Sequence, residues 1–408
     1  MKHRTQRLLG ALAFSVLSMP MFAQMSGTYN IDAAGTGTNN YTSFGSAIAD
    51  LDSLGVSGAV TFNVASGTYT EQVNLGAVTG ASSTNTITFQ GGSSTAASIL
   101  TYTPASSSDN WTVKMTGTDY VTFDNLTITS GGSTYGRLIV YTDTVTNFNL
   151  TNCHLIGTTT SGSSGSTSSF RAGLYYAYPA VAAGNWHISD NTFDSVTYAV
   201  YVYGLGYGAG SGADSVFVED NTINANYNGF YVRYAKYQKM HDNVINDIKG
   251  NSLRNYAYYP VYELDVQNNQ VNEAAYGLYC YTAPPTSGAT GNIKVNVSNN
   301  HFEGTYYGLY VGGSGSSTTE KITDLTIENN TIEAWGSSYN YGIRLNYINA
   351  SATARAKVQN NMISLNTTSS TGTLYGIYPY HCANVDMFHN SIAANGGSLT
   401  NSRLIYLN

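Results

Sequence analysis

Apolar and polar residues alternate along this chain in short segments that recur at a regular interval. From residue 120 onward these segments share an asparagine flanked by apolar residues, as in ISDNTF, VEDNTI, VSNNHF and IENNTI. The mean step, (390 − 125)/9, is about 29 residues. Self-similarity at such a fixed period indicates stacked supersecondary units. The recurring asparagines are Asn125, Asn152, Asn191, Asn221, Asn243, Asn269, Asn300, Asn330, Asn361 and Asn390.

Each repeat is predicted to bend at its asparagine. In residues 297–311 apolar residues lie three before and two after Asn300, so the parity of the inward side chains changes there. A strand of period two cannot change parity without a turn, and asparagine tolerates the left-handed backbone of a tight bend. Because strands stack at about 4.8 Å, we predict a hydrogen-bonded ladder along the axis. Its predicted members are Asn191, Asn221, Asn269, Asn300 and Asn330.

A second periodic marker follows the asparagine: a small residue, an apolar residue and usually a tyrosine, as in GLY at 277–279 and 308–310. Repeats of this length with two or three short strands and no helix predict an all-β fold, a right-handed parallel β-helix. If the apolar residue points inward, the next residue points outward. The outward residues are then Tyr175, Tyr201, Tyr231, Tyr259, Tyr279, Tyr310 and Tyr378, with Arg344 in one repeat.

One helix is predicted, in residues 41–55, where Phe44, Ile48 and Leu51 fall on one face and Gly55 ends the pattern. The exposed edge at the end of a strand stack needs cover, so we interpret this helix as a cap. The predicted organisation is a signal peptide (1–23), a lead-in with the capping helix (24–58) and the β-helix (59–408). We expect the β-helix to continue past residue 408, because RLIYLN has a strand pattern.

The N-terminus has the pattern of a secretory signal: Lys2, Arg4 and Arg7, an apolar stretch over 8–17, and a cleavage site before Gln24. The apolar stretch is short of the roughly 20 residues that span a membrane. We therefore expect an exported chain without membrane insertion after the signal is removed. Removal takes three basic residues from a net charge of −7, giving −10. An acidic chain of this kind argues against a nucleic-acid partner.

The three cysteines, Cys153, Cys280 and Cys382, lie in different repeats and more than a hundred residues apart. A disulfide framework would be denser and evenly paired, so we predict small core residues. No metal-ligand spacing such as CxxC occurs, and we expect neither a metal site nor a cofactor.

Two groups of residues are weak catalytic candidates. Asp190 and Asp220 occupy equivalent positions in consecutive repeats, as does Asp242, and glycoside hydrolysis needs two carboxylates about 5–10 Å apart. The alternative is that they are backbone-bonding turn residues.

Residues 233–242 form the second group, with Arg233, Lys236, Lys239 and His241, and with Tyr231 or Tyr234 nearby. A lyase needs a base and a group that neutralises a uronate, and these residue types supply both. The alternative is a solvated turn between two coils.

The outward tyrosines are the candidate ligand-binding residues, above all Tyr201, Tyr231, Tyr279 and Tyr310. Amphipathic rings suit contact with a polysaccharide or a neighbouring protein at low entropic cost. The alternative is that they only stabilise the sheet as cross-strand pairs, each worth roughly 0.2–1 kcal/mol.

The segments SFGSAIADL, VTFNVASGTYTEQV and ITFQGG, within residues 41–92, resemble the first coils of pectin esterases. The chain thus resembles right-handed β-helix proteins of the pectin-lyase-like superfamily. Its Asn- and Tyr-rich coils resemble large surface proteins exported by Gram-negative Bacteroidota, which implies a cell-surface location. The NTD, GHG and RIK motifs of the polygalacturonases are missing. We therefore expect an adhesin-like scaffold that binds glycans or proteins; the alternative is a polysaccharide lyase or related carbohydrate-active enzyme.

Overall fold

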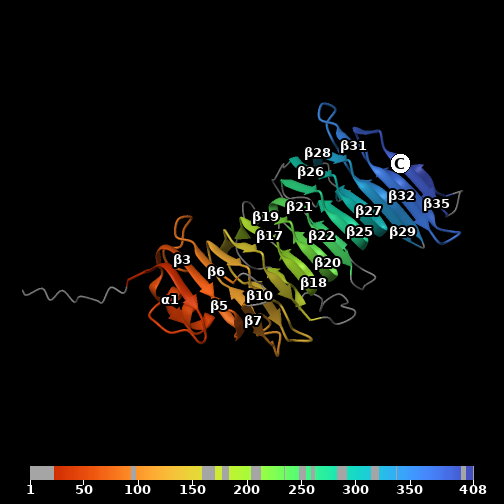
Figure 1. The fold of residues 1–408 in the computed structure, drawn as a ribbon. Helices are drawn as coiled ribbons and strands as arrows, with labels where there is room; N and C mark the ends of the chain where they lie inside the picture. The colour runs from red at the N-terminus through yellow and green to blue at the C-terminus, as the bar shows by residue number, and fades with distance from the viewer. Residues whose placement is uncertain are drawn as a thin grey trace, which may run out of the picture.

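The protein is an elongated right-handed parallel β-helix, and this confirms the predicted fold class. In this computed structural model the helix α1 (Phe44–Leu54) lies at one end of the stack and the C-terminal strands at the other (Figure 1). The predicted signal peptide, Tyr234 and Tyr259 lie outside the described residues, apart from Ala23. The structure describes residues 23–92, 98–158, 171–176, 183–203, 213–233, 235–247, 254–258, 262–282, 292–313, 321–336, 338–396 and 401–407.

Each coil contributes strands to three faces. The first face is a 14-stranded parallel sheet. Its strands, in spatial order, are β2 (Asn40–Tyr41), β1 (Met25–Ile31), β3 (Val56–Val64), β6 (Ile87–Gln90), β9 (Val121–Asp124), β13 (Asn149–Thr151), β17 (Trp186–Ser189), β19 (Ala213–Glu219), β21 (Ala235–His241), β24 (Glu263–Gln267), β26 (Asn292–Ser298), β28 (Lys321–Glu328), β31 (Ala356–Gln359) and β34 (Val385–Phe388).

The second and third faces belong to one 20-stranded sheet, because four long strands run through both: β18 (Thr192–Tyr203), β20 (Thr222–Arg233), β25 (Gln270–Thr282) and β27 (His301–Gly313). The second face adds to their first halves β4 (Gly67–Thr70), β7 (Ser98–Tyr102), β10 (Thr127–Ser130), β14 (His154–Ile156), β22 (Val244–Asp247), β29 (Thr331–Gly336), β32 (Met362–Thr367) and β35 (Ser391–Asn395).

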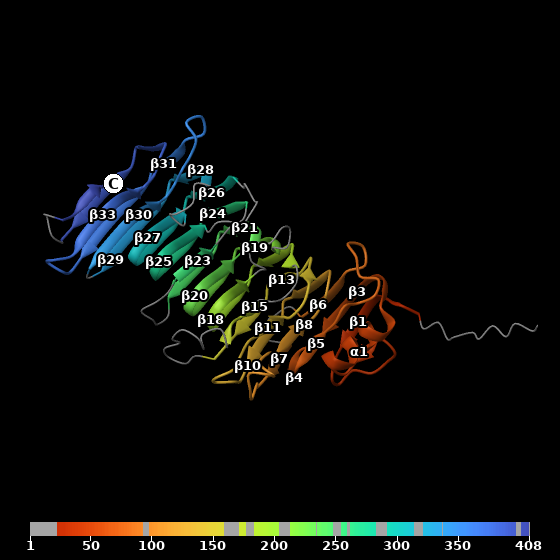
Figure 2. The same cartoon turned by 180° about the vertical axis from the view of Figure 1, so that it is seen from behind.

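The third face adds to the second halves of those long strands β5 (Val73–Leu75), β8 (Val113–Met115), β11 (Ile139–Tyr141), β15 (Leu174–Tyr176), β23 (Arg254–Tyr258), β30 (Tyr339–Asn346), β33 (Thr373–Tyr380) and β36 (Arg403–Ile405). A small extra pair, β12 (Val145–Thr146) and β16 (Ala183–Gly184), lies outside both large sheets. In Figure 2 the strands of the third face follow one another along the length of the molecule.

The core fills the space between the three faces with columns of like side chains. Phe62, Phe89 and Phe123 stack with ring centroids 4.9 Å and 5.4 Å apart, which is close to the strand spacing. Cys153 and Cys280 are buried among the core residues, as predicted, and burial raises the pKa of both thiols to about 12. These thiols are therefore packing groups and not nucleophiles.

Helix α1 falls inside the predicted range of 41–55. It begins after Ser43, whose side chain accepts a hydrogen bond from the Ser46 amide, and Glu71 accepts from two further amides of the first turn. Its buried side chains include the predicted Phe44 and Leu51, and the helix packs against β1, β2 and β5. No helix among the described residues is long and apolar enough to cross a membrane.

The lead-in predicted for residues 24–58 contains more than an extended segment and a helix. Strand β1 pairs in parallel with β3, so the first face already begins before α1 in the chain.

Candidate functional site

Two adjacent residues make the bend between the first and second faces. In the coils from Asp190 onward the first has a left-handed backbone, with φ of 59° at Asp190, 56° at Asp220 and 57° at Asn268. The second is the buried asparagine of the ladder. The prediction that the ladder asparagine itself is left-handed is therefore wrong. The exposed residue before it takes this conformation, and the asparagine side chain turns inward.

The ladder asparagines satisfy one another's hydrogen bonds. The Asn269 Oδ1 accepts from both the backbone amide and the Nδ2 of Asn243, at 3.0 and 2.9 Å. Its own Nδ2 donates to Asn300 Oδ1 at 2.9 Å and to the Met240 carbonyl at 2.7 Å. The same pattern joins Asn191, Asn221, Asn243, Asn269, Asn300, Asn330, Asn361 and Asn390.

The first two of the ten recurring asparagines do not belong to this ladder. Asn125 and Asn152 occupy the left-handed position, with φ of 54° and 53°, and Leu126 and Cys153 follow them inside. The ladder thus begins at Asn191, whose Oδ1 accepts from the Cys153 amide at 2.9 Å. Because its amides are buried and paired, the ladder holds the bend and offers nothing to a ligand.

The candidate aspartates line up in consecutive coils, but at the exposed bend. Asp190, Asp220 and Asp242 all have left-handed backbones and exposed side chains. Partial desolvation, together with repulsion from Asp242 and Asp190, raises the pKa of Asp220. Their conformation accounts for their residue type, since aspartate tolerates this backbone well.

The basic group of residues 233–242 is split by a corner of the solenoid. Arg233 ends β20 on the third face, where its NH1 donates to the Tyr231 hydroxyl at 3.2 Å. Lys236, Lys239 and His241 lie on β21 of the first face, with Lys239 5.0 Å from the ring centre of Phe217. The prediction that they converge is wrong, because the chain changes face between Arg233 and Ala235.

His241 lies between two carboxylates on the first face. Its Nε2 is 3.1 Å from Asp265 and its Nδ1 is 3.6 Å from Glu219. The hydrogen bond to Asp265 raises the pKa of His241 against the effect of desolvation. Burial alone would raise the pKa of Asp265, but hydrogen bonds from His241, Gln267 and Asn296 outweigh it and lower that pKa to about 2. The pair is an ion pair at moderately acidic pH.

The outer side of the third face from β15 to β36, here called the tyrosine face, carries tyrosines in register. Tyr201 stacks on Tyr175 and Tyr231 with centroids 5.0 and 4.8 Å apart, and Tyr279 stacks on Tyr310 at 4.5 Å. Ring planes within these pairs differ by only 10–15°. In the coil of β23 the position in register with Tyr231 and Tyr279 belongs to Tyr256, not to Tyr259 as predicted.

A second tyrosine column lies beside the first, and the sequence analysis did not predict it. Tyr307 stacks between Tyr276 and Tyr341 at 5.1 and 4.8 Å, and Tyr341 stacks on Tyr375 at 4.9 Å. Its signal is a tyrosine three residues before the predicted one, as in YGLY at 276–279 and YGIY at 375–378. Tyr276 also meets Tyr279 edge-on at 5.3 Å, which joins the two columns.

The predicted exposure of the strip holds only in part. Tyr201, Tyr231 and Tyr279 are half-buried, but Tyr310 is only 6% exposed and thus buried. The reason is the stacking itself: the rings of Tyr279 and Tyr307, with centroids 4.5 and 5.4 Å away, cover the Tyr310 ring.

Two arginines are built into these columns. The guanidinium of Arg137 lies 3.5 Å from the ring centre of Tyr175, and burial lowers the pKa of Arg137. Arg344 takes the tyrosine position between Tyr310 and Tyr378, and its NH1 donates to the Tyr307 hydroxyl at 2.8 Å.

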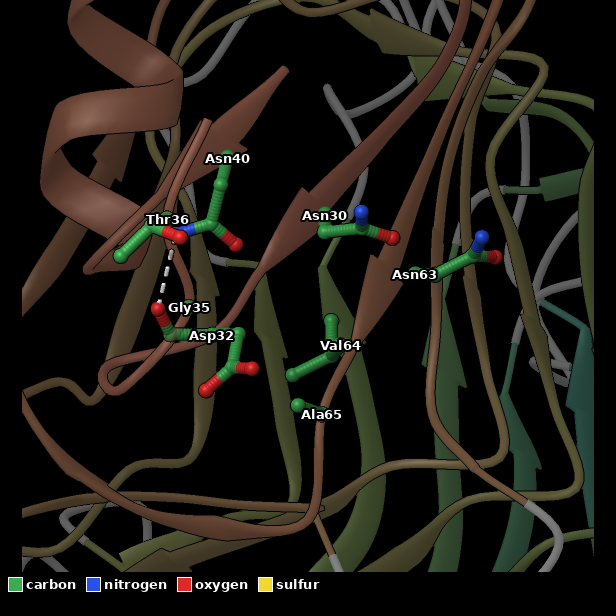
Figure 3. A pocket seen from close by; sticks show the side chains of 8 residues that line it. All are labelled: Asn30, Asp32, Gly35, Thr36, Asn40, Asn63, Val64 and Ala65. Atoms are coloured by element: carbon green, nitrogen blue, oxygen red, sulfur yellow. Dashed lines mark hydrogen bonds between the residues drawn. The ribbon is translucent and has the colours of Figure 1, made fainter. Parts of the chain in front are cut away.

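A polar cavity of about 370 Å³ lies at the N-terminal end of the first face (Figure 3). The loop after β1 closes one side of it, where the Gly35 amide and the Asn40 Nδ2 donate to the Asp32 carbonyl at 3.1 and 3.0 Å. Its lining includes the side chains of Asn30, Asn40, Asn63 and Thr36, which can hydrogen-bond a polar molecule. It includes one titratable side chain, Asp32, so it lacks an acid–base pair.

Comparison with known proteins supports the fold. Residues 172–332 match the family model described as a right handed beta helix region. No curated protein matches the chain in sequence.

Three solved structures show low similarity to this chain. The pectin methylesterase of Aspergillus niger is 13% identical, with a TM-score of 0.32, over 94% of this chain and 92% of that one. The Streptococcus pneumoniae surface protein and adhesin PfbA is 12% identical, with a TM-score of 0.41, over 93% and 100%. The GH136 lacto-N-biosidase of Eubacterium ramulus is 8% identical, with a TM-score of 0.41, over 90% and 68%. Their activities are not carried over to this chain.

Proposed function

We propose that this chain is an exported β-helix scaffold at the cell surface that binds glycans or neighbouring proteins through the tyrosine face. The observation that carries the proposal is the pair of stacked tyrosine columns, which repeat in register from coil to coil. Export rests on the N-terminal pattern alone, and N-terminal sequencing of the exported protein tests it. We expect the mature chain to begin at Gln24 and not at Met1.

The rigidity of the columns suits binding. Stacked rings have few alternative rotamers, so little side-chain entropy is lost when a ligand is bound. Burial raises the pKa of Tyr310 and Tyr341 to about 12, against the effect of Arg344 nearby. These phenols therefore stay protonated at neutral pH and can both donate and accept hydrogen bonds.

The contact that this geometry favours is edge-on. Because the ring faces cover one another, a ligand meets rows of hydroxyls and ring edges at about the strand spacing of 4.8 Å. An elongated ligand lying along the axis of the solenoid would meet equivalent groups in every coil. Extended polysaccharides have this shape, which supports a glycan partner.

The alternative, a polysaccharide lyase or hydrolase, is favoured only by the group around His241. Its raised pKa works against that role, because a general base must be unprotonated near neutral pH. Incubation with polysaccharides and measurement of unsaturated-product absorbance tests it, and a rise that is lost in His241→Gln would support the lyase over the scaffold.

Binding to a panel of immobilised polysaccharides tests the proposal with two matched double variants. Tyr201→Ser/Tyr231→Ser removes a stacked pair from the tyrosine face, and Tyr237→Ser/Tyr262→Ser removes a pair from the first face, with centroids 5.8 Å apart. We expect the first variant to lose binding and the second to keep it. Equal binding by both variants would reduce the tyrosine face to a structural feature.

A further inference from the structure

Charged residues are unevenly distributed over the three faces. The chain as a whole is acidic, with a net charge of −7. On the tyrosine face, however, the described strand segments 174–176, 198–203, 227–233, 254–258, 276–282, 306–313, 339–346, 373–380 and 403–405 contain no Asp or Glu. They contain arginines instead: Arg233, Arg254, Arg344 and Arg403. The tyrosine face is thus a cationic strip on an acidic protein.

On the other two faces several cationic or titratable side chains have carboxylate partners. On the first face Arg355 pairs with Asp386 at 2.8 Å and Lys294 with Glu263 at 2.9 Å. On the second face His154 lies 2.6 Å from Asp194, and His301 lies 3.2 Å from Glu303. All the ion pairs found within the described ranges lie on these two faces.

Arg344 is the clearest case of a guanidinium held by tyrosines instead of a carboxylate. Its central carbon lies 5.2–5.8 Å from four ring centres, and within the described part of the chain its buried Nε has no hydrogen-bond partner. Aromatic rings offset part of the cost of removing a cation from water. Because the Arg344 side chain as a whole is only half-buried, a bound anion can supply the opposite charge. The four rings belong to Tyr307, Tyr310, Tyr341 and Tyr378.

We propose that the ligand of the tyrosine face is an extended anionic glycan, whose carboxylate or sulfate groups bind these arginines. This inference rests on the proposed function and adds the ligand's charge to it. Guanidinium groups bind such oxyanions through paired, planar hydrogen bonds. Arg344 and Arg403 are two strand steps apart, which is about 10 Å at the strand spacing. A glycan that carries charges at intervals along its length can contact more than one of these arginines.

A nucleic acid is the competing polyanion, and the stacking of the rings disfavours it. Single-stranded binders stack bases on exposed ring faces, whereas these ring faces already cover one another.

Titration calorimetry with four probes tests the inference: polygalacturonate for carboxylate, dextran sulfate for sulfate, dextran as the uncharged glycan, and single-stranded DNA. The variants are Arg344→Gln, Arg344→Lys, and Lys357→Gln as the control. Lys357 is an exposed cation on β31 of the first face, so both Gln variants lose one positive charge. Thermal melting checks that each variant is folded.

We expect wild type to bind at least one charged glycan more tightly than dextran, and less tightly as salt rises. Arg344→Gln should weaken that binding about tenfold, from the loss of charge-assisted hydrogen bonds, and leave dextran binding unchanged. Arg344→Lys should keep part of the preference for the charged glycan over dextran, and Lys357→Gln should keep all of it. Equal affinity of wild type for dextran and both charged glycans, or a preference for DNA, would overturn the inference but not a glycan-binding function. Failure to bind any glycan, charged or not, would overturn both.

Discussion

The asparagine ladder and the tyrosine columns have the same period. The ladder consists of hydrogen-bonded amides, whereas the columns consist of stacked aromatic rings. In the ladder every amide is buried and bonded to the next, as between Asn243 and Asn269. In the tyrosine columns the rings stack on one another, and Arg344 donates to the Tyr307 hydroxyl and has no carboxylate partner within the described residues. The ladder's hydrogen bonds lie in the core and stabilise the coil stack, whereas the half-buried rings of Tyr201, Tyr231 and Tyr279 lie at the surface, where they can also contact a partner. Mutation should therefore separate stability from binding.

The largest expected effect on stability is in the ladder. Asn269→Ala leaves the Asn243 amide, the Asn243 Nδ2 and the Met240 carbonyl without their partner in a buried site. We expect a loss of about 3 kcal/mol in the free energy of unfolding, with glycan binding intact while the protein is folded. Urea denaturation measures it.

The neighbouring residue provides the control for that experiment. Asn268 has a φ of 57°, which glycine adopts without strain, so Asn268→Gly should change stability by less than about 1 kcal/mol. If Asn268→Gly and Asn269→Ala destabilise equally, the ladder is not what holds the bend.

For the tyrosine columns we expect a large effect on binding and a small effect on stability. Tyr201→Ser/Tyr231→Ser removes stacking worth about 1–2 kcal/mol in total, yet it should abolish most of the binding. Thermal melting and glycan binding on the same samples measure both. A variant that loses more stability than Asn269→Ala and keeps its binding would reverse the comparison.

The smallest effect concerns the paired charges of the first face. The raised pKa of His241 means that its contribution is complete below the usual pKa of about 6.5 and is lost as the pH rises. The lowered pKa of Asp265, about 2, means that its contribution is present above about 4 and is lost as the pH falls toward 2. The pair thus stabilises most between about pH 4 and 6.5.

Asp265→Asn should flatten this dependence. Urea midpoints at pH 5 and pH 8 measure it, with Lys294→Gln as a control from the same face. Wild type should lose stability at pH 8 through this pair, and Asp265→Asn should lose less. An unchanged difference between the two pH values in Asp265→Asn would show that other groups titrate instead.

The period and parity of the sequence predict the coils, the bend and the register of the ladder. They do not predict which of two adjacent bend residues is left-handed, because pairs such as Asn268-Asn269 tolerate that backbone at both places. They also miss the burial of Tyr310, which comes from rings of other coils.

The prediction that the residues from Arg233 to His241 form one site is wrong for a different reason. Closeness in sequence suggests closeness in space, but here a corner of the solenoid intervenes and the residues end on different faces. Arg344 was visible in the sequence as an interruption of the tyrosine pattern. Only the structure adds that four rings surround it and that acidic residues are on the other faces.

Hydroxyl-radical footprinting of tyrosines, with and without saturating glycan, tests the central claim most directly. Tyr237 and Tyr262 are 45% and 44% exposed on the first face and serve as internal controls. The account predicts that glycan protects Tyr201, Tyr231 and Tyr279 and leaves both controls unchanged. Bound glycan that protects Tyr237 and Tyr262, or that leaves all three residues of the tyrosine face as reactive as before, would contradict it.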